Sequence, residues 1–117
     1  MKKMEMLKKN YEFKNVLTRG KFYSNNEIEV VIQKNNKNCN LLGIAIGTKN
    51  GKAFQRNKAK RLIRESYRKL EPQLIQGNNI IILIKKNFNI NDIKFANVFE
   101  SMQKCFEKAK ILKEEEI

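Results

Sequence analysis

Apolar residues recur at helical spacing in some parts of the chain and gather in short β-branched runs in others. The helical spacing of residues 10–19 predicts a short helix over Asn10–Arg19. Asn10 suits the N-cap of this helix, and Gly20 suits its C-terminal stop. The apolar face of the helix consists of Phe13, Val16 and Leu17.

A longer repeat of apolar positions at i, i+3, i+4 and i+7 predicts another helix, from about Asp92 to Leu112. An aromatic stripe at this spacing is typical of core packing rather than of a cofactor site. Cys105 lies within the pattern, so we expect it to be a small core residue. The stripe consists of Phe95, Val98, Phe99, Met102, Phe106, Ala109 and Leu112.

Runs rich in Val and Ile predict strands over Ile28–Gln33 and Leu41–Gly47, and Lys21–Ser24 is expected to pair briefly. Asn35–Asn40 is polar and predicts a loop. Ile80–Ile84 is apolar on both faces, as in a strand that is covered on both sides. Because a helical segment precedes it, we expect a β-α-β unit that joins it to Leu41–Gly47.

Composition limits the class of protein. A chain of 117 residues fits a single domain over 1–117, and we expect residues 1–6 and 113–117 to be frayed. Its 25 basic and 12 acidic residues give a net charge of +13. Such charge opposes compaction, which favours an acidic partner over a basic surface kept for solubility.

The sequence shows neither an apolar run of the roughly 18–20 residues that span a membrane nor a signal peptide, so we expect a cytoplasmic protein.

The residues offer little catalytic chemistry. The chain has no His, the commonest general base, and Asp92 is its one aspartate. A two-metal nuclease site needs several carboxylates around ions about 3.5–4 Å apart. Cys39 and Cys105 form neither a metal-ligand pattern nor a disulfide framework. We therefore expect no catalytic residue and no metal site, and any cleavage chemistry must come from another molecule.

The arginines are concentrated in one segment. Four of the five lie within residues 56–68, and residues 49–69 hold nine basic side chains and one acid. A guanidinium group binds phosphate through two parallel hydrogen bonds, whereas Lys acts as a point charge. At about 100° per residue, a helix places four basic residues in one i, i+4 row with two more polar residues beside it. The row is Arg56, Lys60, Arg64 and Arg68, flanked by Asn57 and Arg61.

This row predicts a polyanion docked along the helix. Like charges at i, i+4 destabilise a helix by about 0.2–0.5 kcal/mol per pair, and a helix that needed only hydration would interleave glutamates. The one acid, Glu65, lies off the row, and Pro72 is expected to end the helix. The opposite arc, which we expect to pack on the sheet, carries Ala59, Leu62, Ile63, Ser66 and Leu70.

Residues 51–65, GKAFQRNKAKRLIRE, closely resemble the signature of bacterial ribonuclease P proteins, G-x-A-φ-x-R-N-R-x-K-R-φ-φ-R-E, in which φ is apolar. The resemblance extends to Leu7–Phe13, Leu42–Ile46 and Ile80–Ile84, so it covers essentially the whole chain in order. Lys58 stands where the family usually has Arg. The lysine keeps the positive charge but lacks the planar guanidinium fork.

The resemblance implies an α+β domain in the order α-β-β-β-α-β-α, with a mixed sheet and a left-handed β-α-β crossover, a sandwich also found in a ribosomal protein domain. The RNA subunit of this family is the catalyst, binds most of the Mg²⁺ and removes the 5′ leader of precursor tRNA. The protein subunit, inactive alone, would bind that RNA through the basic helix. The residues implied are Arg56, Asn57, Lys58, Lys60, Arg61, Arg64 and Arg68.

The resemblance also implies a cleft between the first helix and the sheet that holds the single-stranded leader. Phe13 matches an aromatic residue that contacts the leader, Leu17 stands where a second aromatic residue is usual, and Ile32 is expected in the same cleft. From the residues alone Phe13 would be a core residue, and both interpretations stay open. The implied partners are ribonuclease P RNA and precursor tRNA, with no membrane and no small-molecule substrate.

Three other classes of protein remain as alternatives. The main one is a ribosome-associated RNA-binding protein or RNA chaperone, which would be equally small and basic. A DNA-binding protein could use Arg56–Arg68 as a recognition helix, although six or more basic side chains suit backbone neutralisation better than base reading. A membrane-surface module ranks last, because the apolar arc is small and the chain has no Trp.

Overall fold

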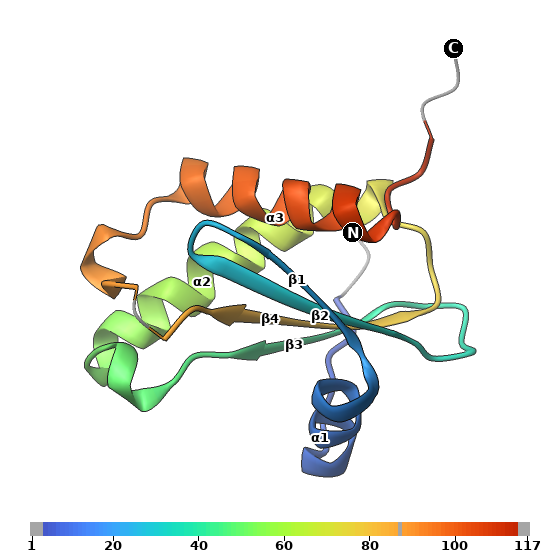
Figure 1. The fold of residues 1–117 in the computed structure, drawn as a ribbon, viewed down its shortest axis with the longest axis horizontal. Helices are drawn as coiled ribbons and strands as arrows, with labels where there is room; N and C mark the ends of the chain where they lie inside the picture. The colour runs from blue at the N-terminus through green and yellow to red at the C-terminus, as the bar shows by residue number, and fades with distance from the viewer. Residues whose placement is uncertain (1–3, 87, 115–117) are drawn as a thin grey trace.

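The computed structural model describes residues 4–86 and 88–114, which form three α-helices and a four-stranded mixed sheet (Figure 1). This arrangement confirms the predicted α+β class and the order α-β-β-β-α-β-α. The helices are α1 (Asn10–Arg19), α2 (Ala53–Leu70) and α3 (Phe95–Ala109), and the strands are β1 (Lys21–Asn25), β2 (Ile28–Lys34), β3 (Leu41–Ala45) and β4 (Asn78–Ile84). Short 3-10 helices lie at η1 (Thr48–Asn50), η2 (Glu71–Gln73) and η3 (Ile90–Asp92).

The sheet has the strand order β1-β2-β4-β3. Strands β1 and β2 form an antiparallel hairpin, β2 pairs antiparallel with β4, and β3 pairs parallel with β4. The parallel pair confirms the predicted β-α-β unit, with α2 as its helix. The left-handed sense of this crossover stays a prediction.

Strand β4 lies at the centre of the sheet and is covered on both faces, as its apolar run predicts. Ile80, Ile82 and Ile84 belong to the core that α2 and α3 build on one face. Ile81 points the other way and packs with Val16 of α1. Figure 1 shows the same division, with α1 on one side of the sheet and α2 and α3 on the other.

Helix α1 differs from the prediction at its N-terminal end and agrees with it at its C-terminal end. The N-cap is Lys9 rather than Asn10, and its backbone N–H donates to Glu12 Oε1 at 3.2 Å. Gly20 does end the helix, and its N–H donates to the Val16 carbonyl oxygen at 2.7 Å. A Cβ on Gly20 would lie 2.6 Å from that oxygen and 2.7 Å from Val31 Cγ1. Glycine is therefore required here because the backbone packs too closely for a side chain.

Helix α3 is shorter than the predicted Asp92–Leu112. It begins only at Phe95, because Ile93 and Lys94 are extended after η3. It ends at Ala109, because Lys110 adopts a left-handed conformation with φ 59°. Most of the predicted stripe is core nevertheless: Val98, Met102 and Phe106 are fully buried. Cys105 is buried with them, as predicted, and this burial raises the pKa of its thiol to about 11.

Both predicted frayed ends are partly fixed. The Leu7 N–H donates to the Leu42 carbonyl at 2.8 Å, and the Leu42 N–H donates to the Glu5 carbonyl at 3.0 Å. This places Met6 beside Leu42 along the outer edge of β3. At the other end, the Lys113 N–H donates to the Gln73 carbonyl at 2.7 Å. Residues 1–3 and 115–117 lie outside the described residues.

Helices α2 and α3 meet at an aromatic contact. The rings of Tyr67 and Phe106 lie edge to face, 6.4 Å apart at 76°, and both residues are fully buried. Tyr67 was not among the predicted packing residues of the basic helix. Within residues 4–86 and 88–114 its hydroxyl has no hydrogen-bond partner, and burial raises its pKa well above the usual range. No helix in the same residues is long and apolar enough to cross a membrane.

The unpartnered hydroxyl generates a stability prediction. Tyr67→Phe removes a buried polar group whose desolvation costs about 1–3 kcal/mol, so we expect the melting temperature to stay level or rise. Tyr67→Ala deletes the ring as well and should lower the free energy of unfolding by about 3–5 kcal/mol. Thermal melting of the two variants tests this. A clear loss of stability in Tyr67→Phe would mean that the hydroxyl has a partner in solution.

Candidate nucleic-acid interface

The basic segment forms α2, as predicted, and packing fixes which face is exposed. At the start of the helix, the Lys52 N–H donates to Gln55 Oε1 at 2.8 Å. The arc that faces the sheet and α3 buries Ala59, Ile63, Ser66, Tyr67 and Leu70, while Leu62 is half-buried. The predicted arc is thus confirmed, with Tyr67 added to it. Burying this arc turns the opposite side of the helix toward solvent.

The exposed side carries most of the predicted phosphate-binding residues. The exposed members are Asn57, Lys58, Arg61, Arg64 and Arg68, and Lys60 is half-buried. Glu65 forms no ion pair within the described residues, where the one pair found joins Lys104 Nζ to Glu100 Oε1 at 3.1 Å on α3. The charges on α2 are therefore left without acidic partners, and this face can attract an anion.

Arg56 also forms hydrogen bonds to the loop that precedes α2. Its Nη1 donates to the Gly51 carbonyl at 2.6 Å and reaches the Thr48 carbonyl at 3.5 Å. This half-buried guanidinium group thus fastens the loop between β3 and α2 to the first turn of the helix. Because a guanidinium group carries five N–H donors, some of them remain free for a phosphate. Arg56 differs in this respect from the exposed arginines.

On the opposite face of the sheet, α1 brings two of the predicted cleft residues together. The Phe13 ring lies against β3, where a Cβ on Gly43 would come within 2.6 Å of Phe13 Cζ. Leu17 belongs to the same apolar cluster, and both side chains are half-buried. Phe13 therefore serves the packing of α1 on the sheet and still exposes part of its surface.

Ile32 does not join them. Side chains alternate between the two faces of a strand, and Val31 is the residue of β2 that packs under α1. Ile32 packs with the core on the α2 and α3 side. The prediction that Ile32 lines the same cleft as Phe13 and Leu17 is wrong, because the sheet separates them.

Several residues of these surfaces were not among those predicted from the sequence. Ala45 and Leu83 pack half-buried beside the cluster of Phe13 and Leu17. Strand alternation counted from Gly43 would have indicated Ala45, because the two residues share a face. Phe54, at an apolar position of the signature, is 70% exposed on the first turn of α2. An exposed position there could not be inferred from its apolar character.

These features define a class of protein: a small basic α+β domain that presents phosphate-binding groups along one helix and a partly exposed apolar surface across the sheet. The family described as Ribonuclease P matches residues 1–110, and the chain belongs to this family. Its members are protein subunits of ribonuclease P, an endoribonuclease that acts in tRNA 5′ processing.

Individual relatives support this assignment. The ribonuclease P protein component of Dictyoglomus turgidum is 40% identical over 111 residues, which cover 95% of this chain and 93% of the relative. That of Clostridium botulinum is 41% identical over 93 residues, with coverage of 79% and 84%. The structure of the Staphylococcus aureus RNase P protein has a TM-score of 0.82 at 26% identity and covers 95% of this chain and 100% of that chain. That of Thermotoga maritima has a TM-score of 0.80 at 28% identity, with coverage of 89% and 96%.

The exposure of Arg64 generates a binding prediction. If Arg64 contacts a phosphate, Arg64→Ala should weaken RNA binding and reduce the slope of log K against log salt by about 0.7–0.9. The melting temperature should hardly change, because the side chain is exposed. Lys104→Ala, on the exposed face of α3, is the matched control. RNA affinity measured across a salt series checks this, and an unchanged slope in Arg64→Ala would mean that the row does not face RNA.

Proposed function

We propose that this chain binds ribonuclease P RNA along α2 and the 5′ leader of precursor tRNA on the α1 face of the sheet, in the bacterial cytoplasm. The observation that carries the proposal is the set of exposed basic side chains on α2, which have no acidic partner within the described residues: Lys58, Arg61, Arg64 and Arg68. Family membership supports ribonuclease P RNA as the polyanion that these side chains bind. A basic helix would also suit an RNA chaperone or a DNA-binding protein, and family membership favours ribonuclease P over both.

The arginines of α2 suit a folded RNA for a geometric reason. Successive members of an i, i+4 row rise about 6 Å along the helix axis, so Arg64 and Arg68 offer separate planar forks in line. Each fork can bind one phosphate through two hydrogen bonds. Lys58, in the usual arginine position, adds charge without this directional contact. The resulting interface neutralises backbone phosphates and leaves base recognition to other parts of the molecule.

The α1 face suits a flexible single strand. Phe13 exposes part of an aromatic ring beside the half-buried side chains of Leu17 and Leu83. Bases of an unpaired strand stack on such rings largely regardless of sequence. Because the four-stranded sheet lies between this face and α2 (Figure 1), the leader and the ribonuclease P RNA can be bound at the same time.

The catalyst in this proposal is the RNA subunit. Among the residues that the structure describes, no group of three His, Cys, Asp or Glu side chains comes together to hold a metal ion. The proposal assigns the Mg²⁺ of the reaction to RNA phosphates, as the resemblance to the family implies. The protein contributes by binding and orienting the two RNA molecules.

Reconstitution tests whether the RNA subunit supplies the catalysis and the protein supplies binding. The purified chain, freed of RNA, should not cleave precursor tRNA at any Mg²⁺ concentration, because it has no His and its described residues bring no three metal-ligating side chains together. Added to a bacterial ribonuclease P RNA, it should increase leader removal at limiting Mg²⁺. Gel analysis of 5′-labelled substrate measures both. Cleavage by the RNA-free protein would contradict the proposal, as would equal stimulation by an unrelated basic protein.

Leader contact is tested by a substitution that keeps apolar volume and removes the ring. Phe13→Leu in the holoenzyme should weaken binding of precursor tRNA with a leader of several nucleotides by about five- to a hundredfold, the usual range for loss of base stacking. Binding of a substrate with a one-nucleotide leader should hardly change. Phe99→Leu, another half-buried aromatic residue on α3, is the control. Equal losses with both substrates, together with a lower melting temperature, would assign Phe13 to the core alone.

A further inference from the structure

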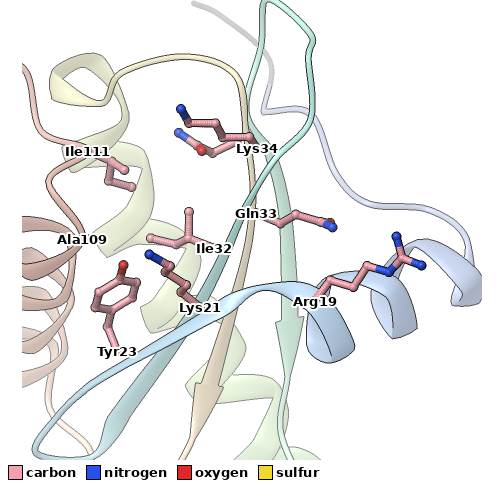
Figure 2. Close-up of a pocket in the computed structure, with 9 residues that line it drawn as sticks. Arg19, Lys21, Tyr23, Ile32, Gln33, Lys34, Ala109 and Ile111 are labelled. Carbon is pink, nitrogen blue, oxygen red and sulfur yellow. The ribbon is translucent and has the colours of Figure 1, made fainter.

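A pocket of about 360 Å³ lies at one corner of the sheet, and its lining includes residues from the end of α1, the start of β1, the end of β2 and the end of α3. Figure 2 shows Tyr23 and Ile32 on the sheet side of this pocket and Ala109 and Ile111 across from them. Lys21 lies at its rim. No residue of α2 lines the pocket, and Phe13 lies across the sheet; α1 contributes only its last residue, Arg19, to the wall.

The pocket exists because two elements stop early. Strand β1 begins at Lys21, which pairs with Ile32, so the last two residues of β2 have no partner on that side. Helix α3 ends at Ala109, and the chain then turns away toward Ile75, whose N–H donates to the Ile111 carbonyl at 2.7 Å. The end of the sheet is therefore left without a helix above it.

The residue pair at this uncovered end is Lys34 and Asn78, which lie opposite each other on β2 and β4. Asn78 lines the pocket and is only 6% exposed. Its backbone N–H donates to Asn40 Oδ1 at 2.8 Å. Its side chain forms part of the wall of the pocket. A nearly buried amide at a cavity offers one acceptor and two donors to a molecule that enters.

The other walls limit what that molecule can be. Ile32 and Ala109 provide an apolar floor, and Tyr23 adds a half-buried aromatic ring. Arg19, Lys21 and Lys34 are exposed cations, and none of the described residues that line the pocket is acidic. A free anion would not use the apolar floor, and an apolar ligand would not use the lysines or the amide. A nucleotide uses all of them.

We propose that this pocket binds one unpaired nucleotide of RNA. Its base stacks on Tyr23 above Ile32, the Asn78 amide hydrogen-bonds to a base edge, and Lys21 and Lys34 bind the phosphate. An amide can pair with an adjacent donor and acceptor on a base edge. The identification of RNA as the source rests on the proposed function. The nucleotide is distinct from any bound beside Phe13, because the sheet lies between the two positions.

The pocket can be tested on the full chain without ribonuclease P RNA, so its failure and that of the proposed function are distinguishable. Each of the four ribonucleoside 5′-monophosphates, and separately inorganic phosphate, is titrated into isotope-labelled protein and followed by amide chemical shifts. We expect saturable shifts at Lys21, Ile32 and Asn78 with at least one nucleotide, and much weaker shifts there with phosphate. Equal affinity for phosphate and nucleotide would overturn the proposal, as would shifts confined to α2.

Substitutions separate stacking from folding. Tyr23→Leu should weaken binding of the nucleotide by about five- to a hundredfold, the range for loss of base stacking, whereas Tyr23→Phe should retain it. Tyr11→Leu is the matched control, because Tyr11 is 67% exposed and lies on α1. An equal loss in Tyr11→Leu, or no loss in Tyr23→Leu, would contradict a stacking role for Tyr23.

A variant that fills the pocket keeps the proposal testable if Tyr23→Leu does not fold. Ala109 is half-buried at the end of α3, so Ala109→Met extends into the pocket without removing a core contact. We expect an unchanged melting temperature and loss of the nucleotide-induced shifts. Lys94→Ala, an exposed lysine before the other end of α3, should leave the nucleotide shifts intact. Undiminished binding to the filled variant would show that the nucleotide binds elsewhere.

Discussion

Repulsion along α2, and the packing that opposes it, is the constraint on which the rest of the structure depends. Arg64 and Arg68 lie one turn apart with like charge, and such pairs destabilise a helix. No acidic side chain relieves them within the described residues. The helix persists because its other face is buried against β4 and α3 through residues such as Ile63 and Tyr67. The unrelieved charge is thus available to RNA only as long as that burial holds.

The same packing decides where the other surfaces lie. Two helices are needed to cover the face of the sheet that supports α2, and a single short helix covers the opposite face. The face under α1 is consequently only partly covered, which leaves Ala45 and Leu83 half-buried beside Phe13. Where α3 ends early, a corner is open on the more heavily covered face as well. Incomplete coverage of the sheet therefore produces both positions at which we place single-stranded RNA.

Elements with a strong period could be predicted from the sequence. The apolar run of β4 indicated a strand buried on both faces, and the row of α2 indicated its exposed side, because each pattern has one interpretation that buries the apolar residues. Ile32 could not be assigned in this way. Val30, Val31 and Ile32 are all apolar, so polarity does not indicate which of them faces α1, and only the register with β4 decides it.

Contacts between segments far apart in the sequence were also beyond prediction. The pairing of Met6 with Leu42 and of Leu74 with Leu112 fixes both ends of the chain, yet isolated bridges leave no periodic pattern. The pocket beside Asn78 depends on the relative lengths of β1, β2 and α3. Element ends are set by local conformations such as that of Lys110, which residue type alone does not specify. The sequence predicted a helix that continues to Leu112. The observed helix ends at Ala109, which lies at the edge of the pocket.

The strand order also has a consequence for synthesis of the chain. Strand β4, which joins β2 to β3, is the last strand to be made. Until residue 84 has left the ribosome, the chain holds a β1–β2 hairpin and a separate β3, and an isolated hairpin is at best marginally stable in water. Helix α2 emerges before β4, so its arginines are exposed on a nascent chain that lacks the sheet to hold them in line. During that interval the basic segment lacks the central strand of the core on which its apolar arc packs in the finished domain.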